Sequence, residues 1–298
     1  MSYKIKSIIE LEELINNREY IDNLTIDVNE DINHLLCNLT NLTYLKFGSN
    51  YNQLSDLSKL SNLQHLKFGN YYDQLTDLSR LSSLQHLEFG SDYNQLTDLS
   101  NCINLQYLQF YGECYNQLLN FSQLTNLTYL MFFQEYNQLT NLSNCINLKH
   151  LEFGLEYNQL TDLSKLSNLT YLKFGDLYKQ PTDLSMLLNL QHLEFKDDYN
   201  QPTDLSMLLN LQHLEFGNFY NQPTDLSMLL NLQHLKFGKK YNQHTDLSAL
   251  SNLIYLYFGD NYNQLADLSK CKKLKRLNYY NIENINLSTY RNGIFKKN

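Results

Sequence analysis

The stretch that decides the fold is residues 181–195, which read P-T-D-L-S-M-L-L-N-L-Q-H-L-E-F. The same wording returns at 202–216, and it returns again at 223–237 with Lys236 in place of Glu. Successive copies begin at Pro181, Pro202 and Pro223, which sets a 21-residue period. Self-similarity with a period of roughly 20 to 50 residues is typical of solenoids and other repeat arrays. The sequence therefore predicts a stack of similar units.

The repeat extends over most of the chain. The Phe that closes each unit recurs with the same period, except for one step between Phe110 and Phe132 that is longer by one. Ile26 and Tyr279 take the same position at the two ends. We therefore assign residues 21–280 to the repeat solenoid, residues 1–20 to an N-terminal helical cap and residues 281–298 to a C-terminal cap or tail. The closing positions are Phe47, Phe68, Phe89, Phe110, Phe132, Phe153, Phe174, Phe195, Phe216, Phe237 and Phe258.

The two ends of the array have the features of caps. Ser7 and Glu10 form a capping-box pattern, which predicts a short helix to about Asn16. A solenoid needs its open ends covered, so we expect this helix to act as a cap. From Lys270 onward the chain turns basic, which indicates a polar cap or, alternatively, a contact with an acidic partner.

Each unit shows the pattern of one short strand followed by tight turns. Leu193, Glu194 and Phe195 alternate between apolar and polar, as in a strand with one buried face. Elsewhere in the unit Leu recurs at every third position, as at Leu54 and Leu57, which suits tight turns or a 3₁₀-like segment. One unit buries too little apolar surface to be stable alone, so stability must come from stacking.

The wording of the unit carries a family resemblance. L-x-x-L-x-F is similar to the strand motif of leucine-rich repeats, and F-G-x-x-Y-N-Q-P at 216–223 resembles the FNIP repeat, a relative frequent in amoebae and in the giant DNA viruses that infect them. The resemblance covers about residues 21–280. It implies an α/β-type, curved solenoid with one short parallel strand per 21-residue repeat and few or no long helices, used for binding proteins.

The resemblance does not carry over in full. Some FNIP proteins have an N-terminal F-box that recruits a ubiquitin ligase, but the segment that precedes the repeats here, 1–20, is too short for that domain. The Pro of the motif is present in only three units, and Leu mostly replaces it. A substrate-recognition role in ubiquitin ligation stays an alternative if another protein supplies the recruiting module.

Composition indicates a cytoplasmic protein, which would mean the host cytoplasm if the chain is viral. No run approaches 18 apolar residues, so we expect no membrane partner. Glu10, Glu12 and Glu13 interrupt any secretory apolar core after the first residues. The five Cys are widely spaced and match neither a zinc site nor a disulfide framework.

Three columns of the repeat are uniform and predict structural roles. Tyr follows each Phe, from Tyr51 to Tyr262, and Gln follows each Tyr two positions later, so we expect stacked rings and amides that bond to each other or to backbone. In the third column each unit holds an Asp or Asn that is followed by Ser two positions later, as at Asp56. It suits an Asx-turn better than a row of calcium sites, because Asn can replace Asp.

The outward strand positions vary from unit to unit, as a binding surface requires. They are rich in Tyr and His, and six of the eight His of the chain lie in one column. Aromatic residues are enriched at protein interfaces. The predicted protein-binding residues are Tyr44, His65, His86, Tyr107, Tyr129, Met131, His150, Tyr171, His192, His213, His234, Tyr255 and Tyr257.

A metal site on the His/Glu column is a less favoured alternative. Rungs about 4.8 Å apart would let two imidazoles share an ion. Three in a straight row, as His192, His213 and His234 would be, do not make a tetrahedron. We expect no metal and no cofactor.

One unit departs from the pattern. It has an extra residue between Phe110 and Tyr115, L-L-N-F at 118–121 in place of L-T-D-L, and Phe133 where Gly is usual. With Tyr111 nearby, the unit at 110–133 is either an exposed apolar partner site or a tolerated bulge.

The sequence favours a non-catalytic scaffold that binds another protein on its concave sheet. It contains no Walker loop, no G-x-G-x-x-G, no H-E-x-x-H, no G-x-S-x-G and no C-x-x-C, so we expect no enzyme and no catalytic residue. A net charge of −8 opposes nucleic-acid binding. The partner and the oligomeric state are left open.

Overall fold

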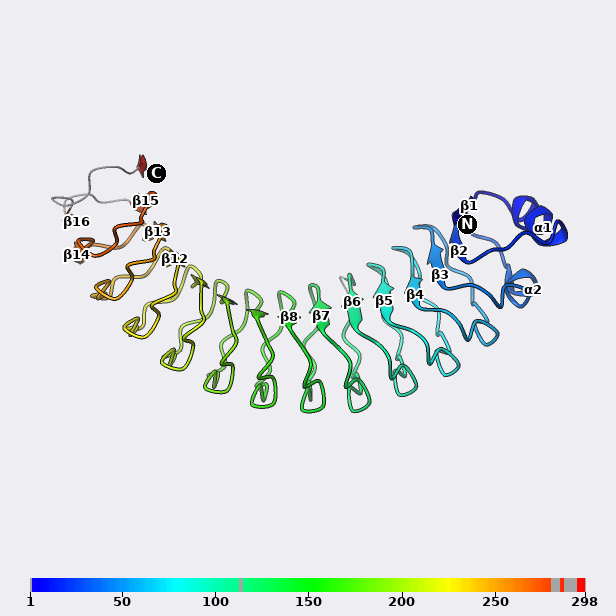
Figure 1. The fold of residues 1–298 in the computed structure, drawn as a ribbon, viewed down its shortest axis with the longest axis horizontal. Coiled ribbons are helices and arrows are strands. Elements are labelled where there is room, and N and C mark those ends of the chain that lie inside the picture. Colours follow the sequence, from blue (N-terminus) through cyan, green and yellow to red (C-terminus); the bar gives the residue numbers. More distant parts are fainter. Residues whose placement is uncertain (1, 113–114, 280–284, 287–293, 298) are drawn as a thin grey trace. The chain divides into compact units, whose positions relative to one another are not determined.

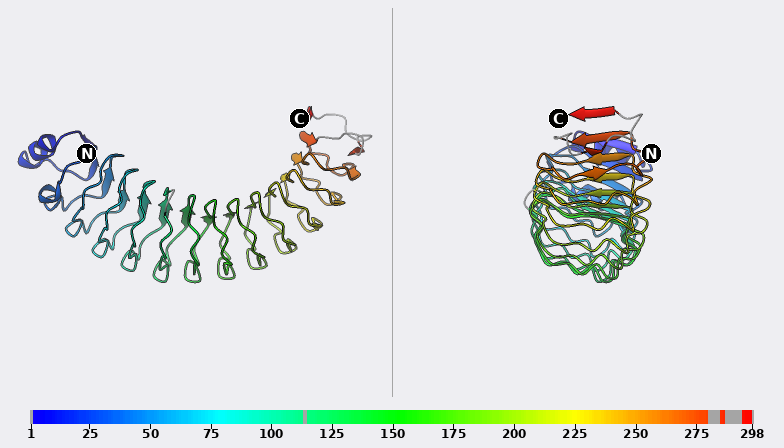
Figure 2. Two further views of the ribbon diagram at one scale, coloured as in Figure 1. Left: turned by 180° about the vertical axis from the view of Figure 1, so that it is seen from behind. Right: turned by 90° about the vertical axis from the view of Figure 1, so that its left-hand side faces the viewer.

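The computed structural model describes residues 2–112, 115–279, 285–286 and 294–297. The chain forms two compact units, Met1–Leu148 and Lys149–Asn298, which are described separately below. Within each unit the strands lie on the inner side of the stack and the tight turns on the outer side (Figure 1). The view from behind shows the strands and the turns on the same sides of each unit (Figure 2).

The first unit is a parallel sheet whose strands follow one another in sequence order, with two short helices near its start. Every described pairing between neighbouring strands is parallel. Its elements are β1 (Ser2–Ile5), α1 (Ile8–Asn16), β2 (Asn23–Ile26), α2 (Asn33–Leu36), β3 (Tyr44–Phe47), β4 (His65–Lys67), β5 (His86–Phe89), β6 (Tyr107–Phe110) and β7 (Tyr129–Phe132).

The second unit repeats this architecture, and its described residues include no helix. Strands β8 to β13, β15 and β17 pair in that order, and β14 pairs with β16 at a second edge. Its elements are β8 (His150–Glu152), β9 (Tyr171–Lys173), β10 (His192–Glu194), β11 (His213–Glu215), β12 (His234–Lys236), β13 (Tyr255–Tyr257), β14 (Ala266–Asp267), β15 (Arg276–Tyr279), β16 (Ile285–Asn286) and β17 (Ile294–Lys297). The predicted fold class, a parallel-strand solenoid with one short strand per repeat and few helices, is confirmed.

The 21-residue period places equivalent side chains side by side. His192 pairs with His213, and Leu193 with Leu214, across β10 and β11. The Leu and Phe of each strand are buried, and within each unit the Phe rings of neighbouring rungs stack with centroids 5.0 to 5.8 Å apart. Each Phe also stacks on the Tyr that follows it in the same rung, at 3.7 Å for Phe237 in the second unit. The expected aromatic ladder is therefore present.

The Leu residues that recur at every third position lie on tight turns. The amide of Leu60 donates to the carbonyl of Leu57 at 3.0 Å, and the amide of Leu63 donates to the carbonyl of Leu60 at 2.9 Å. These i→i+3 bonds turn the chain while each Leu points into the core, where all three are buried.

The N-terminal segment is a helix preceded by a strand. The amide of Glu10 donates to Ser7 Oγ at 3.3 Å, and Glu10 Oε2 accepts from the amide of Lys6 at 2.7 Å, so the predicted helix start is confirmed. The sequence analysis missed β1, whose Ile5 is buried beside Ile26. Ile5 lies one repeat period before Ile26, and this was the available signal.

Neither helix has the length or apolar character needed to cross a bilayer, among the residues that the structure describes. Of the predicted C-terminal cap at 281–298, residues 281–284, 287–293 and 298 lie outside the described residues. The short strands β16 and β17 continue the parallel pairing there.

The Gln column bonds to the preceding rung, through side-chain oxygens and, in several rungs, through the backbone as predicted. Gln74 Nε2 donates to Asn52 Oδ1 of the preceding rung at 3.0 Å, and the same oxygen accepts the amide of Asp73 at 3.0 Å. The same pair of bonds joins Gln243 and the amide of Asn242 to Asn221 in the second unit. Gln243 Nε2 also donates to the backbone carbonyl of Asn221 at 3.1 Å, and three other rungs of the second unit have an equivalent bond, so the predicted bonding to backbone is confirmed there.

A Thr column closes the Tyr ladder. Tyr93 Oη lies 2.7 Å from Thr97 Oγ1, and the same buried pair recurs in most rungs. Leu119 and Ala266 replace that Thr in two rungs. The hydroxyls of Tyr115 and Tyr262 are accordingly buried without a hydrogen-bond partner among the described residues.

This difference predicts opposite effects of the same substitution. Tyr93→Phe breaks a buried hydrogen bond and should lower the free energy of unfolding by about 1 kcal/mol. Tyr115→Phe removes an unsatisfied buried hydroxyl and should raise it by up to about 1 kcal/mol. Urea unfolding followed by circular dichroism measures both; equal destabilisation by the two variants would contradict the assignment.

Candidate protein-binding face

Two outward-facing columns of side chains cover the strand side of each unit. The ring column is occupied by Tyr and His at the first strand position, from Tyr44 to Tyr255, and ends in Arg276. The outer column lies two positions later along each strand, and holds Lys46, Lys67, Glu88, Gln109 and Met131 in the first unit. Together they form what we call the sheet face.

The ring column of the first unit is a continuous stack. His86 lies over Tyr107 with centroids 4.0 Å apart, and Tyr107 lies over Tyr129 at 4.2 Å. His65 lies 6.0 Å from Tyr44 and 5.4 Å from His86 in tilted arrangements. Each ring therefore gives part of its surface to its neighbours.

The second unit repeats the stack. Tyr171 lies between His150 and His192, at 4.1 and 4.2 Å. His192 and His213 stack at 4.1 Å, and His213 and His234 are 5.5 Å apart. His234 then lies 6.0 Å from Tyr255.

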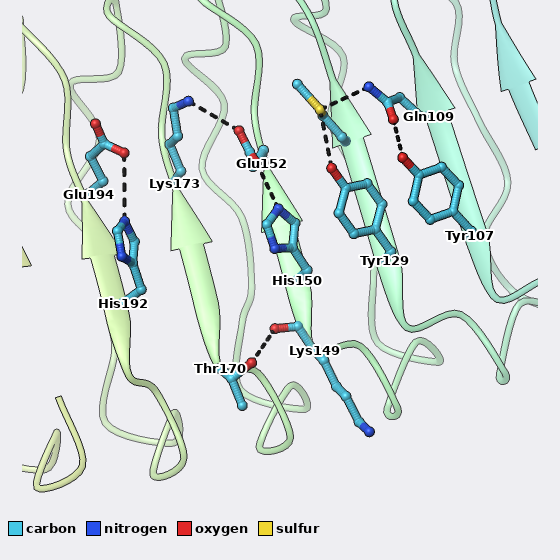
Figure 3. A network of polar contacts seen from close by, with 11 residues as sticks. Tyr107, Gln109, Tyr129, Lys149, His150, Glu152, Thr170, Lys173, His192 and Glu194 are labelled. Atoms are coloured by element: carbon cyan, nitrogen blue, oxygen red, sulfur yellow. Dashed lines mark hydrogen bonds and ion pairs between the residues drawn. The ribbon is translucent and has the colours of Figure 1, made fainter. Parts of the chain in front are cut away.

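His–Glu hydrogen bonds link the two columns, and Lys–Glu ion pairs join neighbouring rungs within the outer column (Figure 3). His150 Nε2 lies 2.7 Å from Glu152 Oε1, and Lys173 Nζ lies 3.1 Å from Glu152 Oε2. In the first unit Glu88 bonds both His86, at 2.6 Å, and Lys67. Burial raises the pKa of Glu88 and Glu152, but the hydrogen bonds from His and Lys outweigh it, so both pKa values lie below that of an ordinary Glu.

Tyr107, Gln109, Tyr129 and Met131 form a neutral cluster in the first unit. Tyr107 Oη donates to Gln109 Oε1, Gln109 Nε2 donates to Met131 Sδ at 3.2 Å, and Tyr129 Oη donates to the same sulfur at 3.4 Å (Figure 3). This cluster lacks the charges of the flanking rungs.

The predicted binding residues all lie on the sheet face, and most are half-buried. Only His65 and His234 of the thirteen are exposed. Partial desolvation by the adjacent rungs lowers the pKa of both, and the neighbouring His lowers it further. The sequence analysis treated variety as the mark of a binding column, whereas the structure gives this column a stacking role as well.

The stacked imidazoles are not arranged as metal ligands. His192 and His213 are parallel to within 11°, so their ring nitrogens lie side by side instead of converging on one point. In the described part of the chain, no group of three or more His, Cys, Asp or Glu is placed to hold a metal ion.

The Asp column forms Asx-turns. Asp56 Oδ1 accepts the amide of Ser58 at 2.9 Å, and Asn120 Oδ1 accepts that of Ser122 at 2.9 Å in the same way. This confirms the predicted local role, which Asn fulfils as well as Asp. Hydrogen bonds with the hydroxyl and the backbone amide of the following Ser lower the pKa of Asp56 and Asp77, and the same two bonds lower that of most other carboxyls in the column.

The irregular unit at 110–133 presents fewer apolar side chains than the sequence allowed. Leu119 and Phe121 are buried, while Tyr111 and Phe133 are exposed by 41% and 42%. Leu118 is exposed by 61%, but the equivalent Leu of other rungs is exposed to the same degree. Residues 113–114 lie outside the described part. The partner-site interpretation of this unit stays a prediction.

The sequence analysis missed the most exposed apolar side chains, which lie on the turns. In the seven units where Leu follows the Gln of the column, as at Leu75, that Leu is exposed by 60% to 66%. In the second unit Met and Leu side chains add to these, and they include Met186 and Leu188. The signal was present: the position of Met186 holds Lys59, Arg80 or Lys165 in other rungs.

Comparison with known proteins identifies the fold. No protein-family model matches the chain, and no curated protein matches it by sequence. Among solved structures, the functional domain of InlJ from Listeria monocytogenes is similar with a TM-score of 0.70 and 20% identity, over 87% of this chain and 61% of that one. CroV588, a circular leucine-rich-repeat protein, gives 0.62 and 25%, over 92% and 53%.

The Toll–Spatzle complex of Drosophila contains a third similar chain, with a TM-score of 0.63 and 16% identity, over 93% of this chain and 41% of that one. The present chain thus spans less than two thirds of each of these three proteins. At such identities the likeness concerns the fold. The chain has the leucine-rich-repeat fold.

Proposed function

We propose that the chain is a non-catalytic scaffold that binds another protein through the sheet face. The observation that supports this most directly is the row of Tyr and His rings, which are packed against one another on their faces and open to solvent at their edges. A side chain held by its neighbours loses little conformational entropy on binding. Such rigid aromatic rows are suited to protein recognition.

The fold supports the same proposal. Leucine-rich-repeat neighbours are generally interaction scaffolds, and one similar chain is in complex with a protein ligand. The charged side chains of the sheet face are largely paired with one another. The cluster around Tyr129 and Met131 carries no charge, so a partner can cover it without burying an unpaired charge. We place the main contact there.

We further propose that the repeats are of the FNIP type and that the protein acts in the cytoplasm. The recurring F-G-x-x-Y-N-Q wording supports the first statement.

Capture from a cell lysate, followed by titration of the purified partner, tests the binding face. The variant Tyr107→Ala, Tyr129→Ala, Met131→Ala should weaken binding by about tenfold or more, because central aromatic contacts dominate interface energies. A matched control, Leu75→Ala with Leu96→Ala, removes exposed apolar side chains from the turns of the same unit and should bind normally.

The far-ultraviolet spectrum and urea midpoint of each variant must be compared first, since the rings also stack. A folded sheet-face variant that binds as tightly as the wild type would overturn this proposal.

A further inference from the structure

We propose that unit 2 carries a second docking surface, on the turns that precede β10, β11 and β12, which binds a basic amphipathic helix of a partner protein. We call it the acid–methionine patch. It consists of Asp183, Asp204, Asp225, Met186, Met207, Met228, Leu188, Leu209 and Leu230. It lies away from the sheet face and is independent of the function proposed above.

The apolar part of the patch is exposed and contiguous. Met186, Met207 and Met228 are exposed by 48%, 47% and 49%. The three Leu, two positions further along each rung, are exposed by 44% to 56%. Because the rungs stack in register, these side chains form two parallel rows. Exposed apolar patches and Met-rich surfaces are typical of partner sites.

The patch ends sharply on both sides. In the rung before it, the Met and Leu positions hold Lys165 and Ser167. In the rung after it, they hold Ala249 and Ser251. Met and Leu therefore occur together in the three rungs that share the repeated wording, whereas Ile103 and Ile146 of the first unit occupy the Leu position beside an Asn.

The same three rungs lack a compensating cation. Elsewhere Lys59, Arg80 and Lys165 lie three positions after an Asp and attract its carboxylate. Where Met replaces that cation, the charges that act on Asp204 are those of Asp183 and Asp225, and they repel it. No ion pair joins these three carboxylates to a Lys or Arg of the described chain.

A groove borders the acidic row. Its volume is about 630 Å³, and Pro181, Pro202, Met186 and Leu160 line it together with Asp183 and Asp204. Each carboxylate is fixed in place, since Asp183 and Asp204 accept the amides of Ser185 and Ser206 at 2.9 Å. The surface thus offers apolar walls beside ordered, exposed negative charges.

The apolar rows and the acidic row together indicate what kind of partner can bind the patch. A partner must supply apolar side chains for the Met and Leu rows and cations for the Asp row. On a helix, residues three or four apart lie about 5–6 Å from each other. The strands of the stack repeat about every 4.8 Å, and the Tyr rings of the same rungs, farther from the strands, repeat every 6.0 to 6.2 Å. A helix along the stack can therefore place Lys or Arg over successive Asp while its apolar face covers successive Met.

Two synthetic, helix-stabilised peptides of equal length test the proposal with the full chain. They share one apolar face of Leu, and one carries Lys where the other carries Glu. We expect the Lys peptide to bind the wild type at least about tenfold more tightly than the Glu peptide, measured by fluorescence anisotropy.

Variants that introduce residues found at the same positions of other rungs test whether the peptide binds at the patch. Met207→Lys with Met228→Lys restores the cation of other rungs, and Asp204→Asn with Asp225→Asn keeps the Asx-turn seen at Asn120. Each pair should weaken binding of the Lys peptide about tenfold or more. Asn101→Lys with Asn144→Lys adds the same charge at equivalent positions of unit 1 and should leave binding unchanged.

Three results would overturn the proposal. The first is equal binding of the two peptides, and the second is unchanged binding by the Met-to-Lys variant. The third is self-association of the wild type that the Met-to-Lys variant abolishes without any peptide binding, which would make a second copy of the chain the occupant. The variant Tyr107→Ala, Tyr129→Ala, Met131→Ala should bind the Lys peptide normally. The test of this patch is therefore independent of the test of the sheet face.

Discussion

Replacing Phe216 by Ala is expected to lower the free energy of unfolding by about 3 to 5 kcal/mol. Phe216 is fully buried and stacks on Phe195, Phe237 and Tyr220, with centroids 5.8, 5.7 and 3.8 Å away. Its removal leaves a cavity shared by three rungs. Because neighbour interfaces carry the stability of a repeat array, a gap inside the stack also weakens the coupling between its two sides.

Urea unfolding followed by circular dichroism measures this effect, and a broadened transition would report the lost coupling. Phe219→Ala is the matched control, three positions away. Phe219 is 43% exposed and contacts only the cation of Lys240 at 4.2 Å among the ring interactions of the described residues, so its loss should change the free energy of unfolding by less than about 1 kcal/mol. Similar losses for the two variants would refute the buried ladder.

Replacing Glu194 by Gln is expected to remove up to about 3 kcal/mol of stability at pH 7, because each pKa unit corresponds to about 1.4 kcal/mol. Burial raises the pKa of this carboxyl, but its interactions with His192 and Lys196 outweigh burial and bring the pKa from 4.5 to about 2. Lys196 Nζ contacts Glu194 Oε1 directly and is the main ion-pair partner, while His192 Nε2 lies 3.8 Å from Oε2, beyond hydrogen-bond distance.

The depressed pKa sets the direction of the pH dependence. The unfolded chain binds a proton at Glu194 below about pH 4.5, while the folded chain stays ionised to about pH 2, so the contribution is complete above 4.5 and is lost between 4.5 and 2. The difference between wild type and Glu194→Gln should narrow over that window. Gln fits the position sterically, because Gln109 occupies the same column and is 4% exposed.

Urea unfolding at a series of pH values gives the measurement. Glu156→Gln is the control, since Glu156 is exposed and should leave the pH dependence as it is. A constant difference between wild type and Glu194→Gln from pH 7 to pH 2 would mean that the ion pairs of Glu194 add nothing to stability.

The sequence by itself determined the architecture. A 21-residue period with Leu at every third position and a closing Phe leaves the chain one way to bury its apolar side chains, which is to stack each unit on the next in register. The Asx-turns at Asp56 and its equivalents and the capping box at Ser7 were also predictable, because those bonds join positions only two to four apart.

Only the tertiary structure decided which outward side chains are free. Glu194 and Tyr107 look alike in sequence as surface residues, yet contacts with neighbouring rungs bury one and half-bury the other. The orphaned hydroxyl of Tyr115 likewise appears only once the position of Leu119 is known. The physical reason is that exposure depends on what the adjacent rung places beside a side chain, whereas periodicity records only the face on which that side chain lies.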